Sequence, residues 1–291
     1  MSENEPYPLT LEPIPAGQFQ GRTGRLWPAG EVPESSAGTL WLATDISRVA
    51  AGPQAGRGLG YLRNLWGTEL LGLNAGGDPD VPLPVELKLK NTGEAIQSLS
   101  LTEYSLWYIL AAEEEASIRA GFQGGLDLVQ AETGADPDRW LEFIPELEVE
   151  TGRCLWLPPG APLILGAGLT LAQLGPPARQ LPAWPPSDAR NNDPRPPAWL
   201  PPAAAGPEED VFFQDGRLSV RLITTARRSD LTAPEALTFI WPLFGQGRVL
   251  TRGPAPTTRL QPGRAVLLPA SLGRYAVESA GTLSYLLIES R

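Results

Sequence analysis

One stretch of this chain occurs twice in related form, and this repeat constrains the fold more than any other feature. Residues 149–165 read V-E-T-G-R-C-L-W-L-P-P-G-A-P-L-I-L, and residues 260–277 read L-Q-P-G-R-A-V-L-L-P-A-S-L-G-R-Y-A-V. Each copy has Gly-Arg, a short apolar run that ends in Leu-Pro, and then a second apolar run. Gly permits a tight turn, and Pro ends a strand because it has no N–H to donate. The pattern predicts two strands in each copy.

The repeat extends upstream of both copies. Residues 106–110 read L-W-Y-I-L, and residues 237–243 read L-T-F-I-W-P-L. Runs rich in aromatic and β-branched residues are typical of strands that are buried on both faces. Two such β units favour a duplicated barrel or jelly roll over the alternative, a chance similarity.

Composition narrows the class of protein. The chain has 291 residues, 42% of them hydrophobic, which indicates a globular protein. Its net charge of −10 argues against nucleic acid and anionic membranes as partners. The single cysteine, Cys154, excludes an internal disulfide, and no apolar run is long enough to span a bilayer. Since residues 1–5 also lack the basic and apolar regions of a signal peptide, we expect a cytoplasmic protein.

Two amino acids that carry much of enzyme chemistry are scarce. The chain has no histidine, and its only lysines are Lys88 and Lys90. Histidine is the commonest metal ligand and the commonest general base near neutral pH. Any chemistry here must therefore use Asp, Glu, Tyr, Lys or Cys154.

Local patterns predict the remaining elements. Apolar spacing predicts a helix over 59–71, with Gly72 just past its end, and two short helices over 126–132 and 137–144. Further strands are expected at 7–13, 38–44, 85–90, 96–101 and 116–122. Residues 175–209 are rich in Pro and Ala and predict a semi-rigid connector. We expect a first domain over 1–174, this connector over 175–209, and a second domain over 210–291.

Several segments together resemble a known family. Residues 38–45, G-T-L-W-L-A-T-D, are similar to a G-E-x-W-x-x-S-D segment, and residues 47–56, S-R-V-A-A-G-P-Q-A-G, to S-x-V-A-N-G-P-L-A-G. Residues 87–89, 106–110, 152–162 and 269–275 match further motifs in the same order. The chain thus resembles the short bacterial form of type I mannose-6-phosphate isomerase. This resemblance implies an all-β double cupin, that is, two jelly-roll β-barrels, with a few short helices in the first half.

The chain departs from the family where the family binds zinc through Gln, His, Glu and His. Alignment with S-V-Q-V-H-P places Leu99 at the Gln position and Leu101 at the first His position. Ser105 takes the place of the Glu, and Leu163 that of the last His. Because leucine has no donor atom for a metal, we expect that zinc does not bind and that the chain has no cofactor. The polar neighbour Gln97 is interpreted as a solvated strand residue.

The substrate side of the resemblance rests on two residues. Lys88 matches a family lysine near the sugar phosphate; the alternative is an exposed strand lysine. Arg179 lies one residue from the position of the catalytic arginine, and an ordinary loop arginine is the favoured interpretation. Lys88 is therefore the candidate substrate-binding residue, and Arg179 is only a weak catalytic candidate.

Three functional hypotheses follow. The first is a non-catalytic, binding or regulatory homologue of mannose-6-phosphate isomerase that has lost its zinc and binds a sugar or sugar phosphate. The second is an active isomerase, interconverting mannose 6-phosphate and fructose 6-phosphate at a relocated or metal-free site with Asp, Glu and Lys around Lys88. The third is a structural or interaction protein whose barrel is plugged by Leu99, Leu101 and Leu163.

Overall fold

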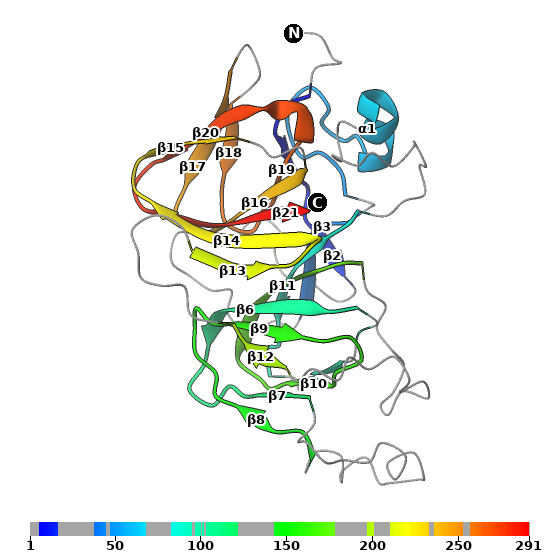
Figure 1. Ribbon diagram of the computed structural model, residues 1–291, viewed down its shortest axis with the longest axis vertical. Helices are drawn as coiled ribbons and strands as arrows, with labels where there is room; N and C mark the ends of the chain where they lie inside the picture. Colours follow the sequence, from blue (N-terminus) through cyan, green and yellow to red (C-terminus); the bar gives the residue numbers. More distant parts are fainter. Residues whose placement is uncertain are drawn as a thin grey trace.

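The chain folds into two jelly-roll barrels, as Figure 1 shows for the computed structural model. The structure describes residues 6–16, 38–44, 47–67, 83–94, 97–99, 101, 103–121, 143–177, 197–200, 210–232, 236–252 and 257–290. All strand pairs in its four sheets are antiparallel. The expectation of an all-β double cupin is confirmed.

Each barrel has a large and a small sheet, and the strands follow one order in both. In the first barrel the large sheet is β12-β9-β6-β11-β4-β3-β2 and the small sheet is β5-β10-β7-β8. Its strands are β2 (Ile14–Ala16), β3 (Gly38–Ala43), β4 (Glu86–Asn91), β5 (Gln97–Leu99), β6 (Ser105–Ala112), β7 (Ile118–Ala120), β8 (Glu146–Leu147), β9 (Cys154–Leu157), β10 (Leu163–Leu165), β11 (Leu169–Gly175) and β12 (Ala198–Trp199).

In the second barrel the large sheet is β1-β19-β16-β21-β14-β13 and the small sheet is β15-β20-β17-β18. Its strands are β1 (Leu9–Thr10), β13 (Asp210–Gln214), β14 (Leu218–Thr225), β15 (Arg228–Thr232), β16 (Leu237–Phe244), β17 (Gly247–Thr251), β18 (Thr258–Leu260), β19 (Val266–Leu268), β20 (Arg274–Ser279) and β21 (Leu283–Ser290). A 3-10 turn over Ala270–Leu272 precedes β20.

The repeated stretch has the same place in both barrels. Its two strands are β9 and β10 in the first copy and β19 and β20 in the second, as predicted. The upstream aromatic strands pair with the first of these in the same register. Leu106 lies opposite Trp156 on β6 and β9, and Phe239 lies opposite Leu267 on β16 and β19. The matching registers support duplication over chance similarity.

Three hydrophobic clusters hold the barrels together. One lies between the two large sheets, where residues such as Leu89 and Trp156 and, from the other sheet, Phe239 and Leu286 are buried. The other two fill the barrel interiors. Since each fully buried large apolar side chain contributes about 1.5–3 kcal/mol, the cluster between the large sheets stabilises the contact between the two barrels.

Two short strands cross the expected domain boundaries. β1, in the first expected domain, pairs with β19 in the second barrel, with Leu9 opposite Leu267. β12, in the expected connector, pairs with β9, with Trp199 opposite Leu155. The division at 174 and 209 therefore stays a prediction. In the structure, sheets of both barrels contain strands from either side of an expected boundary.

The predicted helix over 59–71 exists but is shorter. Helix α1 spans Leu59–Trp66 and buries Leu59, Leu62 and Trp66. It ends where Gly67 adopts a positive φ of 66°, and the expected cap at Gly72 lies outside the described residues. The helices predicted at 126–132 and, up to residue 142, at 137–144 lie outside the described residues. Among the helices that are described, none has the length and apolar character needed to cross a bilayer.

Candidate functional site: buried lysines in the first barrel

Strand β4 turns its polar side chains into the first barrel. Leu87 and Leu89 belong to the cluster between the large sheets, so the alternating residues Glu86, Lys88 and Lys90 point the other way. Only 8% of the surface of each lysine is exposed. The alternative of an exposed strand lysine at Lys88 is therefore wrong, because both faces of β4 are covered.

Register extends this polar face across the large sheet. Lys88 lies opposite Trp41 on β3 and opposite Gln173 on β11, and Gln173 lies opposite Trp107 on β6. Trp107 is fully buried and Gln173 is 7% exposed. A row of one lysine, one amide and two indoles thus crosses four strands on the inner face of the barrel.

Lys88 has a full set of partners in this row. Its Nζ lies 2.9 Å from Glu86 Oε2 and 3.9 Å from the centroid of the Trp41 ring. The carboxylate balances the ammonium charge, and the indole face adds a cation–π contact. The candidate residue of the sequence analysis is thus a neutralised, well-packed cation.

Lys90 lies two residues further along β4, and its positive charge is less well balanced. Its Nζ donates to Gln97 Oε1 at 2.9 Å and lies 5.8 Å from the centroid of the Trp107 ring. Across the described part of the chain, no carboxylate pairs with it. Burial, and secondarily the charge of Lys88, lowers the pKa of Lys90 from 10.5 to about 8. The site therefore contains a buried cation that lacks an anion.

Gln97 corrects an expectation. The sequence interpretation placed it in solvent, on the face of β5 opposite Ser98. In the structure Gln97 is half-buried and its side-chain oxygen accepts the hydrogen bond from Lys90. The alternation was right, but the interior face is the one that carries Gln97 and Leu99.

The positions aligned with the family's zinc ligands lie near this row. Leu99 on β5 and Leu163 on β10 are direct cross-strand partners, and Leu163 is 2% exposed. Leu99 and Leu101 are partly buried against the hydrophobic cluster that contains Leu163. Ser105 is buried, and its Oγ accepts a hydrogen bond of 2.7 Å from Trp107 Nε1. All four positions thus have structural contacts with the barrel interior.

Other sequence candidates add no chemistry to this site. Cys154 is buried, which raises the pKa of its thiol to about 12 and keeps it protonated. Arg179 lies outside the described residues. Over the described ranges, no three His, Cys, Asp or Glu side chains gather closely enough to hold a metal ion.

Sequence reasoning identified Lys88 but missed most of its neighbours. Lys90 and Glu86 could have been found, since they share the face of Lys88 on an alternating strand. Trp41 and Gln173 could not, because they join the row only through pairing with strands about 45 and 85 residues away.

The comparisons with known proteins agree with this architecture. No model of a protein family matches the chain, and no curated protein matches it by sequence. Among solved structures, the mannose 6-phosphate isomerase from Bacillus subtilis matches with a TM-score of 0.73 and 18% identity, covering 97% of this chain and 99% of that one. A single-residue variant of phosphomannose isomerase from Salmonella typhimurium matches with a TM-score of 0.69 and 11% identity, covering 96% and 98%.

A zinc-bound mannose 6-phosphate isomerase is similar as well, with a TM-score of 0.67 and 12% identity over 96% of this chain and 98% of that one. At such identities the likeness concerns the fold and not the reaction. The chain therefore shares, over nearly its whole length, the double-cupin fold of mannose-6-phosphate isomerases.

Proposed function

We propose that this chain is an isomerase-like cupin that has lost zinc and binds a sugar phosphate without turning it over. The observation that carries the proposal is Lys90, a buried ammonium whose polar partner is the neutral amide of Gln97. An uncompensated buried charge is unfavourable, and an anionic ligand would relieve it. A phosphate beside Lys90, with Lys88 two residues away, supplies that anion.

The inner face offers further contacts for such a ligand. Gln97 and Gln173 can each donate and accept hydrogen bonds, which suits sugar hydroxyls. Trp41, Gln97 and Glu86 are each only partly buried, so this end of the row reaches the surface of the barrel.

The residues present do not fit zinc. Leu99, Leu101 and Leu163 have no donor atom, and the hydroxyl of Ser105 is occupied by the indole of Trp107. The nearest oxygen donors, on Glu86 and Gln97, already contact the two lysines. Two ammonium groups would also repel a divalent cation. We therefore derive no metal-assisted step.

Calorimetric titration tests the proposal. Mannose 6-phosphate and fructose 6-phosphate, in the presence of a chelator, should bind to the wild-type chain, whereas free mannose should not. Lys90→Met should weaken binding by at least 10-fold, about 1.4 kcal/mol. Arg119→Met is the matched control, because Arg119 is a cation of the same barrel that already pairs with Glu146 at 2.7 Å on the surface. Equal affinity in Lys90→Met and wild type would refute the proposal.

One observation favours the metal-free isomerase as a second candidate. Glu86 and Lys90 flank Lys88, and Lys90 with a pKa of about 8 is partly neutral near physiological pH. A neutral amine can accept the proton that aldose–ketose isomerisation moves between adjacent carbons. Turnover of mannose 6-phosphate that survives a chelator and is lost in Lys90→Met would establish this alternative. Turnover that requires added zinc would overturn both candidates, and the absence of turnover and of binding would leave the structural role.

A further inference from the structure

Charge is distributed unevenly along the chain. Residues 1–209 contain 13 Lys and Arg against 27 Asp and Glu, which gives a net charge of −14. Residues 210–291 contain 10 Arg against 6 Asp and Glu, which gives +4. The basic excess therefore belongs to the second barrel, within a chain that is acidic overall.

Much of this excess lies on the outer face of the small sheet of the second barrel. Register places Arg228, Glu278 and Arg248 side by side across β15, β20 and β17. Glu278 binds Arg248, and Arg228 donates to Asp230 at 3.0 Å. In this row each arginine has a carboxylate.

The row at the other end of the same strands differs. Arg274 on β20 lies opposite Thr232 on β15. Thr251 pairs with Tyr275, so Arg252, the next residue after Thr251, reaches the neighbourhood of Arg274. Both arginines are exposed, and neither has a carboxylate partner among the described residues. Like charges at neighbouring cross-strand positions are unfavourable unless an anion joins them.

A pocket of about 530 Å³ lies over this second row. Its lining includes Arg252, Arg274, Thr232 and the Arg228–Asp230 pair. Pockets that hold small ligands have volumes of about 300–1,000 Å³. The volume and the two unpaired guanidinium groups together suit a small anion.

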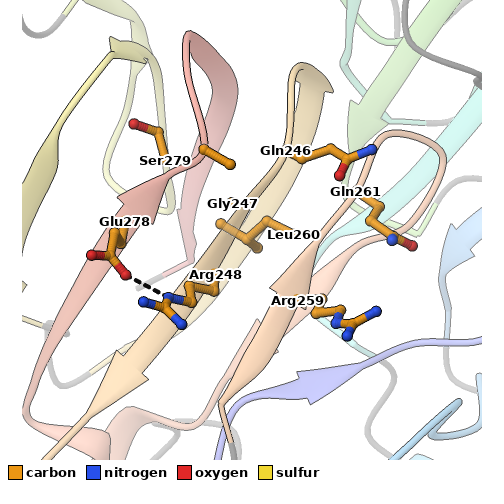
Figure 2. A pocket seen from close by; sticks show the side chains of 9 residues that line it. Gln246, Gly247, Arg248, Arg259, Leu260, Gln261, Glu278 and Ser279 are labelled. Carbon is orange, nitrogen blue, oxygen red and sulfur yellow. Dashed lines mark hydrogen bonds and ion pairs between the residues drawn. The ribbon is translucent and has the colours of Figure 1, made fainter.

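A second pocket on the same sheet, of about 430 Å³, provides the comparison. Figure 2 shows Glu278 turned toward Arg248 there, with Arg259 on the neighbouring strand. The carboxylate of Glu278 thus pairs with one arginine of this pocket, Arg248. In the pocket over Arg252 and Arg274 the carboxylate of Asp230 pairs with Arg228, so among the described residues Arg252 and Arg274 have no carboxylate partner.

We propose that Arg252 and Arg274 bind phosphate or the phosphate group of a monoester on this outer face. Guanidinium groups donate paired hydrogen bonds to phosphate oxygens, and a tetrahedral dianion can contact two of them at once. The hydroxyl of Thr232 is placed to donate a third bond. This site lies on the second barrel and is independent of the lysine row in the first.

Calorimetry in a Lys90→Met background, in which binding at the first barrel is weakened, tests this site through the further effect of variants at Arg252 and Arg274. The probes are inorganic phosphate, glycerol 3-phosphate and citrate. We expect phosphate and glycerol 3-phosphate to bind, and Arg252→Gln or Arg274→Gln to raise Kd by about 10-fold or more. Arg259→Gln is the matched control, because Arg259 is an exposed arginine of the same sheet without a carboxylate partner among the described residues.

Three outcomes would overturn the assignment. Absence of phosphate binding in this background removes the site. An equal loss of affinity in Arg259→Gln would show attraction by general surface charge. Binding of citrate without binding of either phosphate probe would exclude phosphate as the ligand class. Since Lys90, which carries the proposed sugar-phosphate function, is absent from every arm, failure of the outer site is distinguishable from failure of that function.

Discussion

The two barrels place a cation at the same position of the same strand and use it in the same way. Lys88 on β4 and Arg221 on β14 hold corresponding registers, since each lies two strands away from the aromatic strand that begins the repeat. Each has a carboxylate partner: Glu86 at 2.9 Å for Lys88, and Glu289 at 2.6 Å for Arg221. The carboxylates, however, occupy different positions: Glu86 lies on the same strand as Lys88, whereas Glu289 lies on β21, the strand next to that of Arg221.

The next inward-facing position separates the barrels. In the first barrel it is Lys90, and in the second it is Ile223, which is 3% exposed within a hydrophobic cluster. Ile223 completes an apolar interior, whereas Lys90 adds a charge that the described residues do not balance. One strand position thus distinguishes a barrel with an aliphatic side chain at this point from one with a second buried cation.

The largest effect should come from breaking the ion pair of the second barrel. Arg221→Met leaves the buried carboxylate of Glu289 without its cation, and we expect unfolding free energy to fall by about 3 kcal/mol. The double variant Arg221→Met/Glu289→Leu should recover most of that loss, because no unpaired charge remains. Urea unfolding measures both, and a double variant as unstable as the single one would contradict this account of the pair.

The pH dependence of stability tests Lys90. Its pKa is about 8 in the folded chain and 10.5 without burial, so the unfolded state binds more protons between these values. The stability cost is therefore full below pH 8 and is relieved as the pH rises toward 10.5. Relative to Lys90→Met, the wild type should gain on the order of 2–3 kcal/mol over that window. Urea unfolding of both proteins at pH 7 and pH 10 measures this difference. An equal change of unfolding free energy in wild type and Lys90→Met would refute the prediction.

Ligand binding at the first barrel should also depend on the protonation of Lys90, but it should weaken as the pH rises. A phosphate beside Lys90 favours the protonated amine, so affinity should decline as the pH rises through about 8 and beyond. We expect roughly a 10-fold weakening per pH unit between the pKa of Lys90 in the free protein, about 8, and its higher pKa in the complex. Calorimetry with fructose 6-phosphate at several pH values measures the slope, and a flat profile would separate the ligand from Lys90.

Two equivalent hydroxyl positions refine the comparison at a smaller scale. Ser105 lies opposite Leu157 and Thr238 lies opposite Leu268 in matching registers. Ser105→Ala leaves the buried indole N–H of Trp107 unsatisfied and should cost about 1–2 kcal/mol. Thr238→Val removes only a donor to the Ala236 carbonyl at 3.3 Å and should cost less than 1 kcal/mol. Thermal unfolding of the two variants measures these losses. Equal losses of stability would show that the hydrogen bond to Trp107 contributes no more than the bond made by Thr238.

The smallest effect should be at the surface of the first barrel. Arg119 and Glu146 pair across β7 and β8 with side chains 38% and 56% exposed. Because water and salt screen such pairs, Arg119→Ala should change stability by no more than about 0.5 kcal/mol. A loss as large as that of Arg221→Met, measured in the same urea series, would mean that burial does not explain the difference between these pairs.

Sequence reasoning reached the fold because its signals are local and repeated. The Gly-Arg and Leu-Pro spacing and the two aromatic runs each lie within one copy, so no long-range pairing had to be known. The interior of the first barrel was harder. Alternation placed Lys88 and Lys90 on one face of a strand, but whether that face met solvent depended on β5 and its residue Gln97, which a local pattern does not reveal.

The predicted end of a helix and the predicted partner of a strand also depended on features that a local sequence pattern does not reveal. Helix α1 ends at Trp66, and the positive φ of Gly67 that follows it is not visible in the apolar spacing of the sequence. The strand over 7–13 was predicted as a leading edge strand, and β1 does occupy an edge of a sheet. Its sheet, however, belongs to the barrel formed by residues more than 200 positions later.

That long-range pairing has a consequence for how the protein is made. Besides the ladder between β1 and β19, Leu11 N–H donates to the Ala265 carbonyl at 2.9 Å, and the Thr258 hydroxyl donates to the Pro8 carbonyl, 250 residues away, at 2.9 Å. On the ribosome, residues 8–11 emerge early and can contact residues 48–50, but strand β1 has no ladder partner until β19 has been synthesised. The first barrel can begin to fold during translation, whereas the second must wait to recruit a strand from the opposite end of the chain.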